Sequence, residues 1–507
     1  PNTDVEIGYD GKIYLADFGG GWVRSDNGNI YAIHHPASAG ETTSQTEKLF
    51  RDGFPDSTEE LFALLSHPDM RVRQAAQFKL VAIDHPARPD QFAEFARSQP
   101  APACYHAVWG LRQLGEVDLD AADELVGLLD HEDAELRAQA IRALGDLRHE
   151  PAYQSILVRS VEGTPRERAF AAIAFGKIGN AKALTALVNI VLENDNRDLD
   201  LRHATIYAFE KLVHGDWAED VIGQLRKHES PALRLVTCLA LRRQLSPRVA
   251  LFLEDADPSV SAAAIRACND LDVPGGAEAL AEFSKRYATG GHGVTPLSEI
   301  LFRRLINANV RAGEPAHAIN LVALAANAKL REKQRLLCLK ALETFVEPAP
   351  IDPTLGIYRP LEARDFETIK MAIEKALLEL FKSATGEVAA AVTRLVTIYD
   401  LSLDQGLLAR RILDSRQPAN LRKAALERLG ADPDFTDKAV FRGTLADSDP
   451  GVRAAAGRIW TQRFPDEAME AIRTLLENDL DSDKRTAFAL HAELESPESD
   501  LLLAGLL

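Results

Sequence analysis

Residues 128–137 read Leu128-Leu129-Asp130-His131-Glu132-Asp133-Ala134-Glu135-Leu136-Arg137. An apolar helix end leads into a short polar turn, and an aliphatic–arginine pair then opens a second helix that is rich in alanine. The same order of residue types recurs at residues 64–75 and 445–455. The arginine marks the register of each copy, and consecutive marks lie 31 to 34 residues apart: Arg137, Arg168, Arg202 and Arg234, then Arg422, Arg453 and Arg485. A repeat of this length is typical of stacked helical hairpins.

The repeated pattern resembles the HEAT repeat. It predicts an all-α fold, a right-handed α-solenoid of HEAT-like helical hairpins over residues 57–507. The rhythm is irregular at residues 284–300, which contain a Gly-Gly-His-Gly run, and at residues 345–366, which are rich in proline. Insertions in solenoids lie on one face and often contact partners. We therefore interpret four residues of these segments as candidate partner contacts: His292, Tyr358, Arg359 and Arg364.

Several copies carry a hydrogen-bond acceptor in the turn, six positions before the register arginine. It is histidine in three copies (His67, His131 and His228) and aspartate in two others (Asp447 and Asp479), and both side chains accept a hydrogen bond from a backbone N–H group. This interchange favours a structural turn over a metal site. We expect the register arginines to form a ladder along the stack, bonded to carbonyl or acidic groups. The turn and ladder pairs are His67 with Arg73, His131 with Arg137, His228 with Arg234, and Asp447 with Arg453.

Composition limits the classes of protein and partner. A chain of 507 residues exceeds the size of one compact core, and 46% hydrophobic with 26% charged residues indicates a folded, soluble protein. The net charge of −18 repels phosphate backbones, so we expect no nucleic-acid partner. No apolar run approaches the ~20 residues that span a bilayer. The four cysteines form no C-x-x-C pair, and their alanine-rich surroundings predict buried structural thiols.

The first 35 residues differ from the rest. Alternating apolar residues at 11–18 and 29–33, with Asp10-Gly11 and Asn27-Gly28 turns, predict two β-strands. Two strands are not stable alone, so they need a further sheet or must dock onto the helices. Residues 36–56 follow as a predicted linker.

The segments Tyr9–Phe18 and Gly28–Ile33 resemble the last blade of a β-propeller of the glucose/sorbosone dehydrogenase type. Together with the repeats and the segment Arg359-Pro360-Leu361-Glu362-Ala363-Arg364-Asp365, they resemble planctomycete-type "membrane-bound dehydrogenase" proteins. Such proteins join a quinoprotein propeller, a HEAT region and a c-type cytochrome. The resemblance implies that residues 1–35 are a remnant of the last blade, that the parent carries pyrroloquinoline quinone (PQQ) and haem c, and that it is exported to the periplasm.

No catalytic motif of the G-x-S-x-G, H-E-x-x-H or C-x-x-C-H type occurs in the chain. We therefore predict no catalytic, cofactor-binding or metal-binding residue, and no enzyme activity or cofactor for this chain by itself. The favoured function is a scaffold that binds protein partners or neighbouring domains of the same polypeptide. Two alternatives stay open: part of an active quinoprotein sugar or alcohol dehydrogenase that requires the propeller, or a free-standing module that binds a protein, peptide or glycan.

Overall fold

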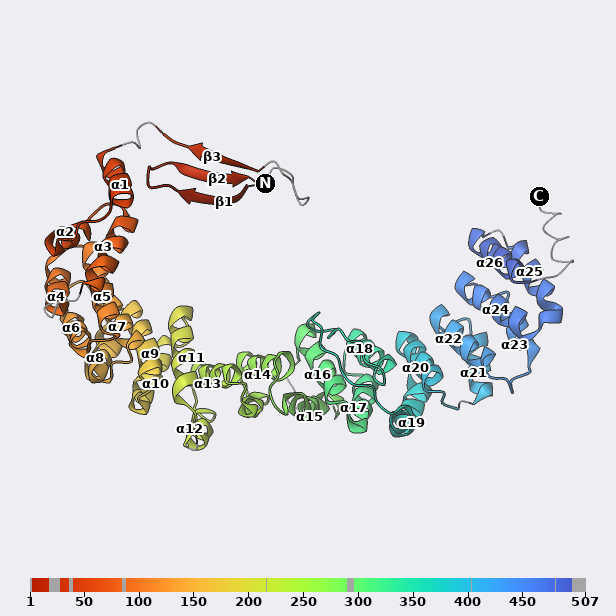
Figure 1. Ribbon diagram of the computed structural model, residues 1–507. Helices are drawn as coiled ribbons and strands as arrows, with labels where there is room; N and C mark the ends of the chain where they lie inside the picture. The colour runs from red at the N-terminus through yellow and green to blue at the C-terminus, as the bar shows by residue number, and fades with distance from the viewer. Residues whose placement is uncertain are drawn as a thin grey trace. The chain divides into compact units, whose positions relative to one another are not determined.

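The protein is mostly helical, with a small sheet near its N-terminus (Figure 1). The computed structural model describes residues 2–17, 28–35, 40–83, 88–215, 217–289, 296–402, 404–478 and 480–494. The predicted solenoid of helical hairpins is confirmed. The chain divides into two compact units, residues 1–244 and 245–507, and each is described by itself.

The N-terminal sheet has three antiparallel strands in the order β1 (Asn2–Ile7), β2 (Ile13–Asp17) and β3 (Asn29–Ile33). The two predicted strands are present. Strand β1 was not predicted, because Val5 and Ile7 are its only large apolar residues. In the register, Val5 lies opposite Leu15, and Ile7 lies opposite Ile13. The third strand therefore supplies part of the sheet that two strands lacked.

The sheet docks onto the first helices of unit 1. Helix α1 (Glu41–Asp52) lies within residues 36–56, where a linker is predicted. Phe50 of α1 stacks on Tyr9 beside the sheet, with ring centroids 3.8 Å apart. Arg71 donates to the carbonyl oxygen of Ile7 at 2.6 Å and lies over the Tyr9 ring. These contacts explain why a Ser- and Thr-rich segment is helical, since tertiary packing outweighs weak helix propensity.

Unit 1 is built of two rows of helices. The first helix of each hairpin lies in one row: α2 (Thr58–Leu64), α4 (Arg88–Ser98), α6 (Leu119–Gly127), α8 (Tyr153–Glu162), α10 (Leu184–Asn194) and α12 (Ala218–Leu225). The second helices form a continuous row in which each contacts the next: α3 (Met70–Ala82), α5 (Ala103–Leu114), α7 (Ala134–Asp146), α9 (Pro165–Ile178), α11 (Leu199–Leu212) and α13 (Pro231–Arg243).

Unit 2 has the same organisation. A 3-10 segment, Pro247–Phe252, is followed by the first helices α15 (Gly276–Thr289), α17 (Pro315–Ala326), α19 (Phe366–Ser383), α21 (Gln405–Leu413), α23 (Lys438–Thr444) and α25 (Ala468–Glu477). The second helices are α14 (Pro258–Asp270), α16 (Glu299–Ala312), α18 (Glu332–Glu343), α20 (Gly386–Ile398), α22 (Ala419–Gly430), α24 (Pro450–Arg463) and α26 (Asp481–Ala492). The long connection between α18 and α19 is the proline-rich segment, here called the insertion (residues 344–365).

Small residues let the second helices approach closely. A Cβ atom added to Gly145 of α7 would lie 2.7 Å from the Cα atom of Ala174 of α9. Ala138 and Ala140 of α7 are fully buried. The alanine-rich second helices thus form the core between neighbouring hairpins, because interiors of this kind are close-packed.

The four cysteines are free and buried, as predicted. Burial raises the pKa of Cys104 to about 11 and that of Cys268 to about 12. Because the thiolate is the reactive form, these thiols are structural.

Candidate functional site

The predicted turn residues occupy one position in four hairpins. The Nδ1 atoms of His67, His131 and His228 accept the backbone N–H of the residue two positions later, at 3.0, 3.0 and 3.1 Å. Asp447 Oδ1 accepts the N–H of Asp449 at 2.8 Å in the same way. In each case the donor residue is itself the N-cap of the following helix. The turn side chain therefore orients the cap that satisfies the first helical N–H groups.

The register arginines connect each turn to the next hairpin. The Nη1 atoms of Arg73, Arg137, Arg234 and Arg453 donate to the carbonyl oxygen of the turn residue six positions earlier. From Nε, Arg137 donates to Glu167 at 2.7 Å, and Arg453 donates to Asp483 at 2.9 Å. These acidic partners lie 30 residues further along the chain. Within each unit, the arginines therefore tie successive hairpins together.

No cluster of three or more His, Cys, Asp or Glu side chains is placed to bind a metal ion in the part of the chain that the structure describes. Among the described helices, none combines the length and the apolar composition needed to cross a bilayer. His292, one of the four candidate partner contacts, lies outside the described residues. The other three, Tyr358, Arg359 and Arg364, lie in the insertion.

The insertion contains a tight turn centred on Asp352. Its carboxylate Oδ1 accepts the backbone N–H groups of Thr354 at 2.8 Å and Leu355 at 3.0 Å. Gly356, with a φ of +70°, donates its N–H to the Asp352 carbonyl. The sequence Asp352-Pro353-Thr354-Leu355-Gly356 is typical of a turn, although no turn was predicted at this position.

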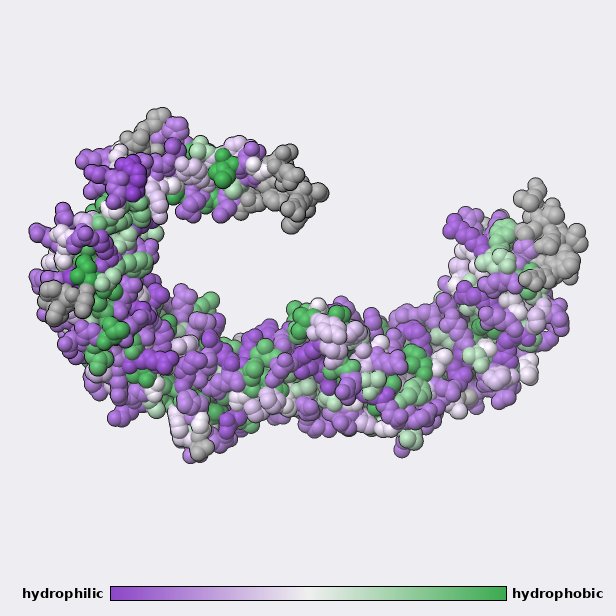
Figure 2. Space-filling view, viewed as in Figure 1, coloured by the Kyte–Doolittle hydropathy of each residue, from purple (hydrophilic) through white to green (hydrophobic). Residues whose placement is uncertain are grey.

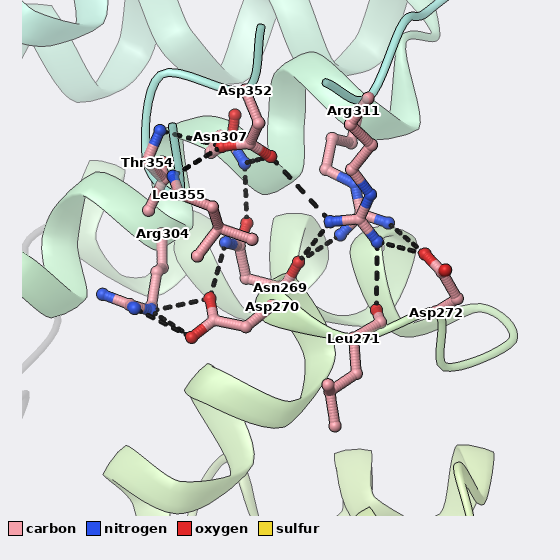
Figure 3. A network of polar contacts seen from close by, with 11 residues as sticks. Asn269, Asp270, Leu271, Asp272, Arg304, Asn307, Arg311, Asp352, Thr354 and Leu355 are labelled. Carbon is pink, nitrogen blue, oxygen red and sulfur yellow. Dashed lines mark hydrogen bonds and ion pairs between the residues drawn. The ribbon is translucent and has the colours of Figure 1, made fainter. Parts of the chain in front are cut away.

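Asp352 also joins the insertion to the second-helix row (Figure 3). Its side chain is buried, and Oδ2 accepts from Asn307 Nδ2 of α16 at 3.0 Å. Asn307 donates in turn to Asn269 Oδ1 of α14, also at 3.0 Å. Both asparagines are buried. The insertion is therefore anchored through a satisfied buried polar network, which fixes its position more firmly than surface contacts would.

Arginines near the end of the insertion fix it to the C-terminal ends of second helices. Arg359 donates to the carbonyl oxygens of Asn269 at 2.9 Å and Leu271 at 3.3 Å, and it forms an ion pair with Asp272. Arg311 of α16, labelled in Figure 3, donates to the same Asn269 oxygen at 2.5 Å. Burial, together with the nearby Arg359 charge, lowers the pKa of Arg311. Cations at these positions complement the negative end of the helix dipole.

Arg364 has the same kind of role one hairpin further on. It donates to the carbonyl oxygens of Val310 and Phe345, at the ends of α16 and α18, and its guanidinium lies 4.5 Å from the centroid of the Phe345 ring. The structure therefore brings Arg359 and Arg364 onto one insertion but engages both in bonds within the chain. Tyr358, in contrast, is 74% exposed.

A cavity of about 380 Å³ lies between α16, α18 and the insertion. Its apolar lining includes Ile306, Val310, Leu337, Pro348 and Leu361. Its charged lining comprises Arg303, Arg311, Lys340, Glu343, Asp352 and Arg359. Figure 2 shows hydrophobic surface where the insertion lies beside α16 and α18. Ile351 and Ile357 of the insertion are 47% and 48% exposed. Arg303 and Lys340 were not predicted as site residues, because no sequence motif marks them.

Residues 122–210 match the family model for HEAT repeats. Comparison with curated proteins gives no match. A homology model of the full-length AP-3 complex is similar at 12% identity, over 89% of this chain and 88% of that chain, with a TM-score of 0.36. The CpcE–CpcF complex of phycocyanin lyase from Nostoc sp. PCC7120 is similar at 20% identity, over 58% and 89%, with a TM-score of 0.25. The karyopherin Kap121p, bound to the extreme C-terminus of the protein phosphatase Cdc14p, is similar at 12% identity, over 88% and 51%, with a TM-score of 0.38. The helical part of this chain is a HEAT/armadillo-like α-solenoid.

Proposed function

We propose that this chain is a non-catalytic protein-binding scaffold, and that its partner docks on the insertion and the cavity beside it. The observation that carries the proposal is the exposure of Ile351, Ile357 and Tyr358 on a loop that buried polar bonds hold in place. Clustered exposed apolar side chains are typical of interaction sites. Loops that project from a rigid scaffold commonly carry binding residues.

Two features of the site favour binding. The insertion is fixed before the partner arrives, so little conformational entropy is lost on association. The cavity volume of about 380 Å³ is within the range of ligand pockets, and it is large enough for an apolar side chain. Tyrosine supplies an amphipathic contact at low entropic cost, which explains its enrichment at interfaces.

A peptide selection tests this proposal. Random peptides displayed on phage are selected on the full chain, and the affinity of the selected peptides is measured by fluorescence anisotropy. We expect Tyr358→Ala and Ile357→Ser each to weaken binding, because both remove exposed apolar surface from the site. Met371→Ala is the matched control, since Met371 of α19 is 68% exposed outside the insertion. Equal affinities for all three variants would contradict the proposed location.

The resemblance to planctomycete-type dehydrogenases extends the proposal. In this extension, the scaffold belongs to an exported polypeptide in which a propeller carries PQQ and a separate domain carries haem c. The sequence patterns at Tyr9–Phe18 and Gly28–Ile33 support it, together with the antiparallel pairing of their strands β2 and β3. The natural gene product, purified from its host, should then show a haem c spectrum and oxidise a sugar or alcohol in a dye-linked assay. This chain by itself, with added PQQ and calcium, should oxidise no sugar or alcohol in the same assay. Turnover by this chain alone would overturn the non-catalytic assignment.

A further inference from the structure

Four consecutive second helices of unit 2 each present an exposed cationic side chain. These are Arg266 on α14, Arg303 on α16, Lys340 on α18 and Arg394 on α20. Each helix contacts the next, so the cations follow one another along the row. We call these four residues the cationic row. Arg266, Lys340 and Arg394 all lie nine residues after the N-cap of their helix, which places them at the same level of the row.

The cationic row stands out against the charge of the chain. The four helices hold eight Lys and Arg residues and five Asp and Glu residues, in a chain whose net charge is −18. Among the described residues, no ion pair involves Arg266 or Lys340. Arg303 pairs with Glu299 at 2.7 Å, and Arg394 pairs with Glu343 at 3.5 Å. Exposed pairs of this kind contribute little to stability and can exchange partners.

Two members of the row, Arg303 and Lys340, also line the cavity beside the insertion. Arg311 and Arg359 add positive charge to the same cavity. Its two carboxylates are both engaged: Asp352 accepts from Asn307 and from the backbone of its own turn and lies 3.8 Å from Arg359, and Glu343 pairs with Arg394 of the cationic row. The cavity therefore combines apolar walls with a cationic rim. Such a site complements a ligand that carries carboxylates on either side of an apolar group.

We propose that the docked segment of the partner is an acidic, extended peptide, an inference that rests on the proposed function. Neighbouring packed helices are ~8–10 Å apart. A polyproline II chain has three residues per turn and rises ~3.1 Å per residue, so every third side chain faces the same side at intervals of ~9 Å. Acidic residues three positions apart therefore match Lys340 and Arg394, which lie at the same level of adjacent helices. An apolar residue beside them enters the cavity, where Arg303 of α16 adds a third cation.

Fluorescein-labelled synthetic peptides test the inference on the full chain. The probe is a 12-residue peptide with Glu at every third position, Leu near its centre, and Pro and Ser elsewhere. Its counterpart has Gln in place of Glu. We expect the Glu peptide to bind at least tenfold more tightly than the Gln peptide, and its affinity to fall as salt is raised, because exposed charges are screened.

Charge-reversal variants locate the binding site. Lys340→Glu and Arg303→Glu should each weaken binding of the Glu peptide about tenfold or more. Two control variants make the same change in net charge: Arg458→Glu, at the equivalent level of α24 but outside the cavity, and Lys375→Glu on α19. Their affinity for the Glu peptide should stay within about twofold of that of the wild type. Circular dichroism and thermal unfolding of each variant show that the fold is retained. Equal losses for Lys340→Glu and Lys375→Glu would overturn the inference.

Further outcomes separate this inference from the proposed function. If selected peptides without acidic residues bind, are weakened by Tyr358→Ala and are unaffected by Lys340→Glu, the acidic chemistry is wrong and the docking site stands. If the Glu peptide is weakened by Lys340→Glu but not by Tyr358→Ala, the cationic row is supported and the docking role of the insertion is wrong. If a labelled oligothymidylate binds more tightly than the Glu peptide and responds to Lys340→Glu, the row recognises nucleic acid and the inference fails.

Discussion

Arg453 and Asp483 form a buried ion pair between α24 and α26. Arg453 donates to Asp483 Oδ2 from Nε at 2.9 Å and from Nη2 at 2.7 Å, and the two side chains are 7% and 0% exposed. Nη1 of the same guanidinium donates to the carbonyl oxygen of Asp447 in the preceding turn. One side chain thus joins a turn, its own helix and the next hairpin.

Replacing Asp483 by Ala should destabilise unit 2 strongly. The substitution leaves the Arg453 charge buried without its partner, and breaking a buried pair in this way costs about 3–5 kcal/mol. Urea unfolding followed by circular dichroism measures the change. The control is Lys382→Ala, because Lys382 and Glu379 form a pair in which both side chains are more than half exposed, and its loss should leave the unfolding curve unchanged. Similar curves for the two variants would refute the role given to Asp483.

The repeat could be predicted from the sequence because its signal is local. The aliphatic–arginine pair, the turn acceptor six positions earlier and the alanine-rich helix all lie within about one hairpin, and they recur at a fixed interval. The partners of the arginines were not predictable individually. Arg137 reaches Glu167 and Arg73 reaches His106, and only the packing of successive hairpins determines which side chain stands at that point.

His131 should be replaceable by Asp but not by Ala. Its Nδ1 atom accepts the N–H of Asp133, and Asp447 makes the same bond in another hairpin. His131→Ala removes the acceptor and should lower the free energy of unfolding by roughly 1 kcal/mol. His131→Asp should recover most of that loss. Urea unfolding of the two variants makes the comparison, and equal losses would show that the ring contributes through packing instead.

His106 should make stability depend on pH below neutrality. Its Nε2 atom accepts from Arg73 Nε at 3.2 Å, so the ring proton is on Nδ1, which faces Gln77 Oε1 at 2.8 Å. Burial, reinforced by the Arg73 charge, lowers the pKa of His106 to about 4. The unfolded chain therefore takes up a proton between pH 6.5 and about 4 that the folded chain does not bind. Stability contributed by the neutral ring is complete above pH 6.5 and falls as the pH drops toward 4.

The variant His106→Gln isolates this effect, because glutamine accepts and donates at the same site without titrating. The difference in free energy of unfolding between wild type and variant should be constant above pH 6.5. As the pH falls from 6.5 to 4, the wild type should lose free energy of unfolding relative to the variant. Urea unfolding at pH 7.5 and 4.5 measures both values, and an unchanged difference would mean that His106 protonates equally in the folded and unfolded chains.

The site could be predicted only in outline. Prolines and the loss of helical rhythm located the insertion, and Tyr358 is exposed as a contact residue requires. The anchoring role of Arg359 and Arg364 was not visible, because both bind backbone carbonyl groups at helix ends up to 90 residues away. A carbonyl group carries no sequence signal. Asn269 and Asn307 could not be recognised either, because their side chains meet each other and Asp352 only after the chain has folded, 38 and 45 residues apart in sequence.

Asp352→Ala should release the insertion without unfolding the helices. The carboxylate supports the turn through two backbone N–H groups and holds the insertion to Asn307, so its loss removes three hydrogen bonds and leaves the Asn307 amide buried with fewer partners. Hydrogen exchange of residues 351–358 should accelerate, whereas exchange in α16 and α18 should change little, because those helices keep their own cores. Asp365→Ala is the control: it removes the N-cap of α19 at the far end of the insertion but no bond to Asn307.

If the insertion acts in binding because it is fixed in advance, Asp352→Ala should also weaken the binding of those peptides that Tyr358→Ala weakens. The variant retains Ile351, Ile357 and Tyr358, so any loss of affinity comes from the lost order of the insertion. If Asp352→Ala exchanges faster but binds the peptides with unchanged affinity, the apolar side chains of the insertion bind without being held in place.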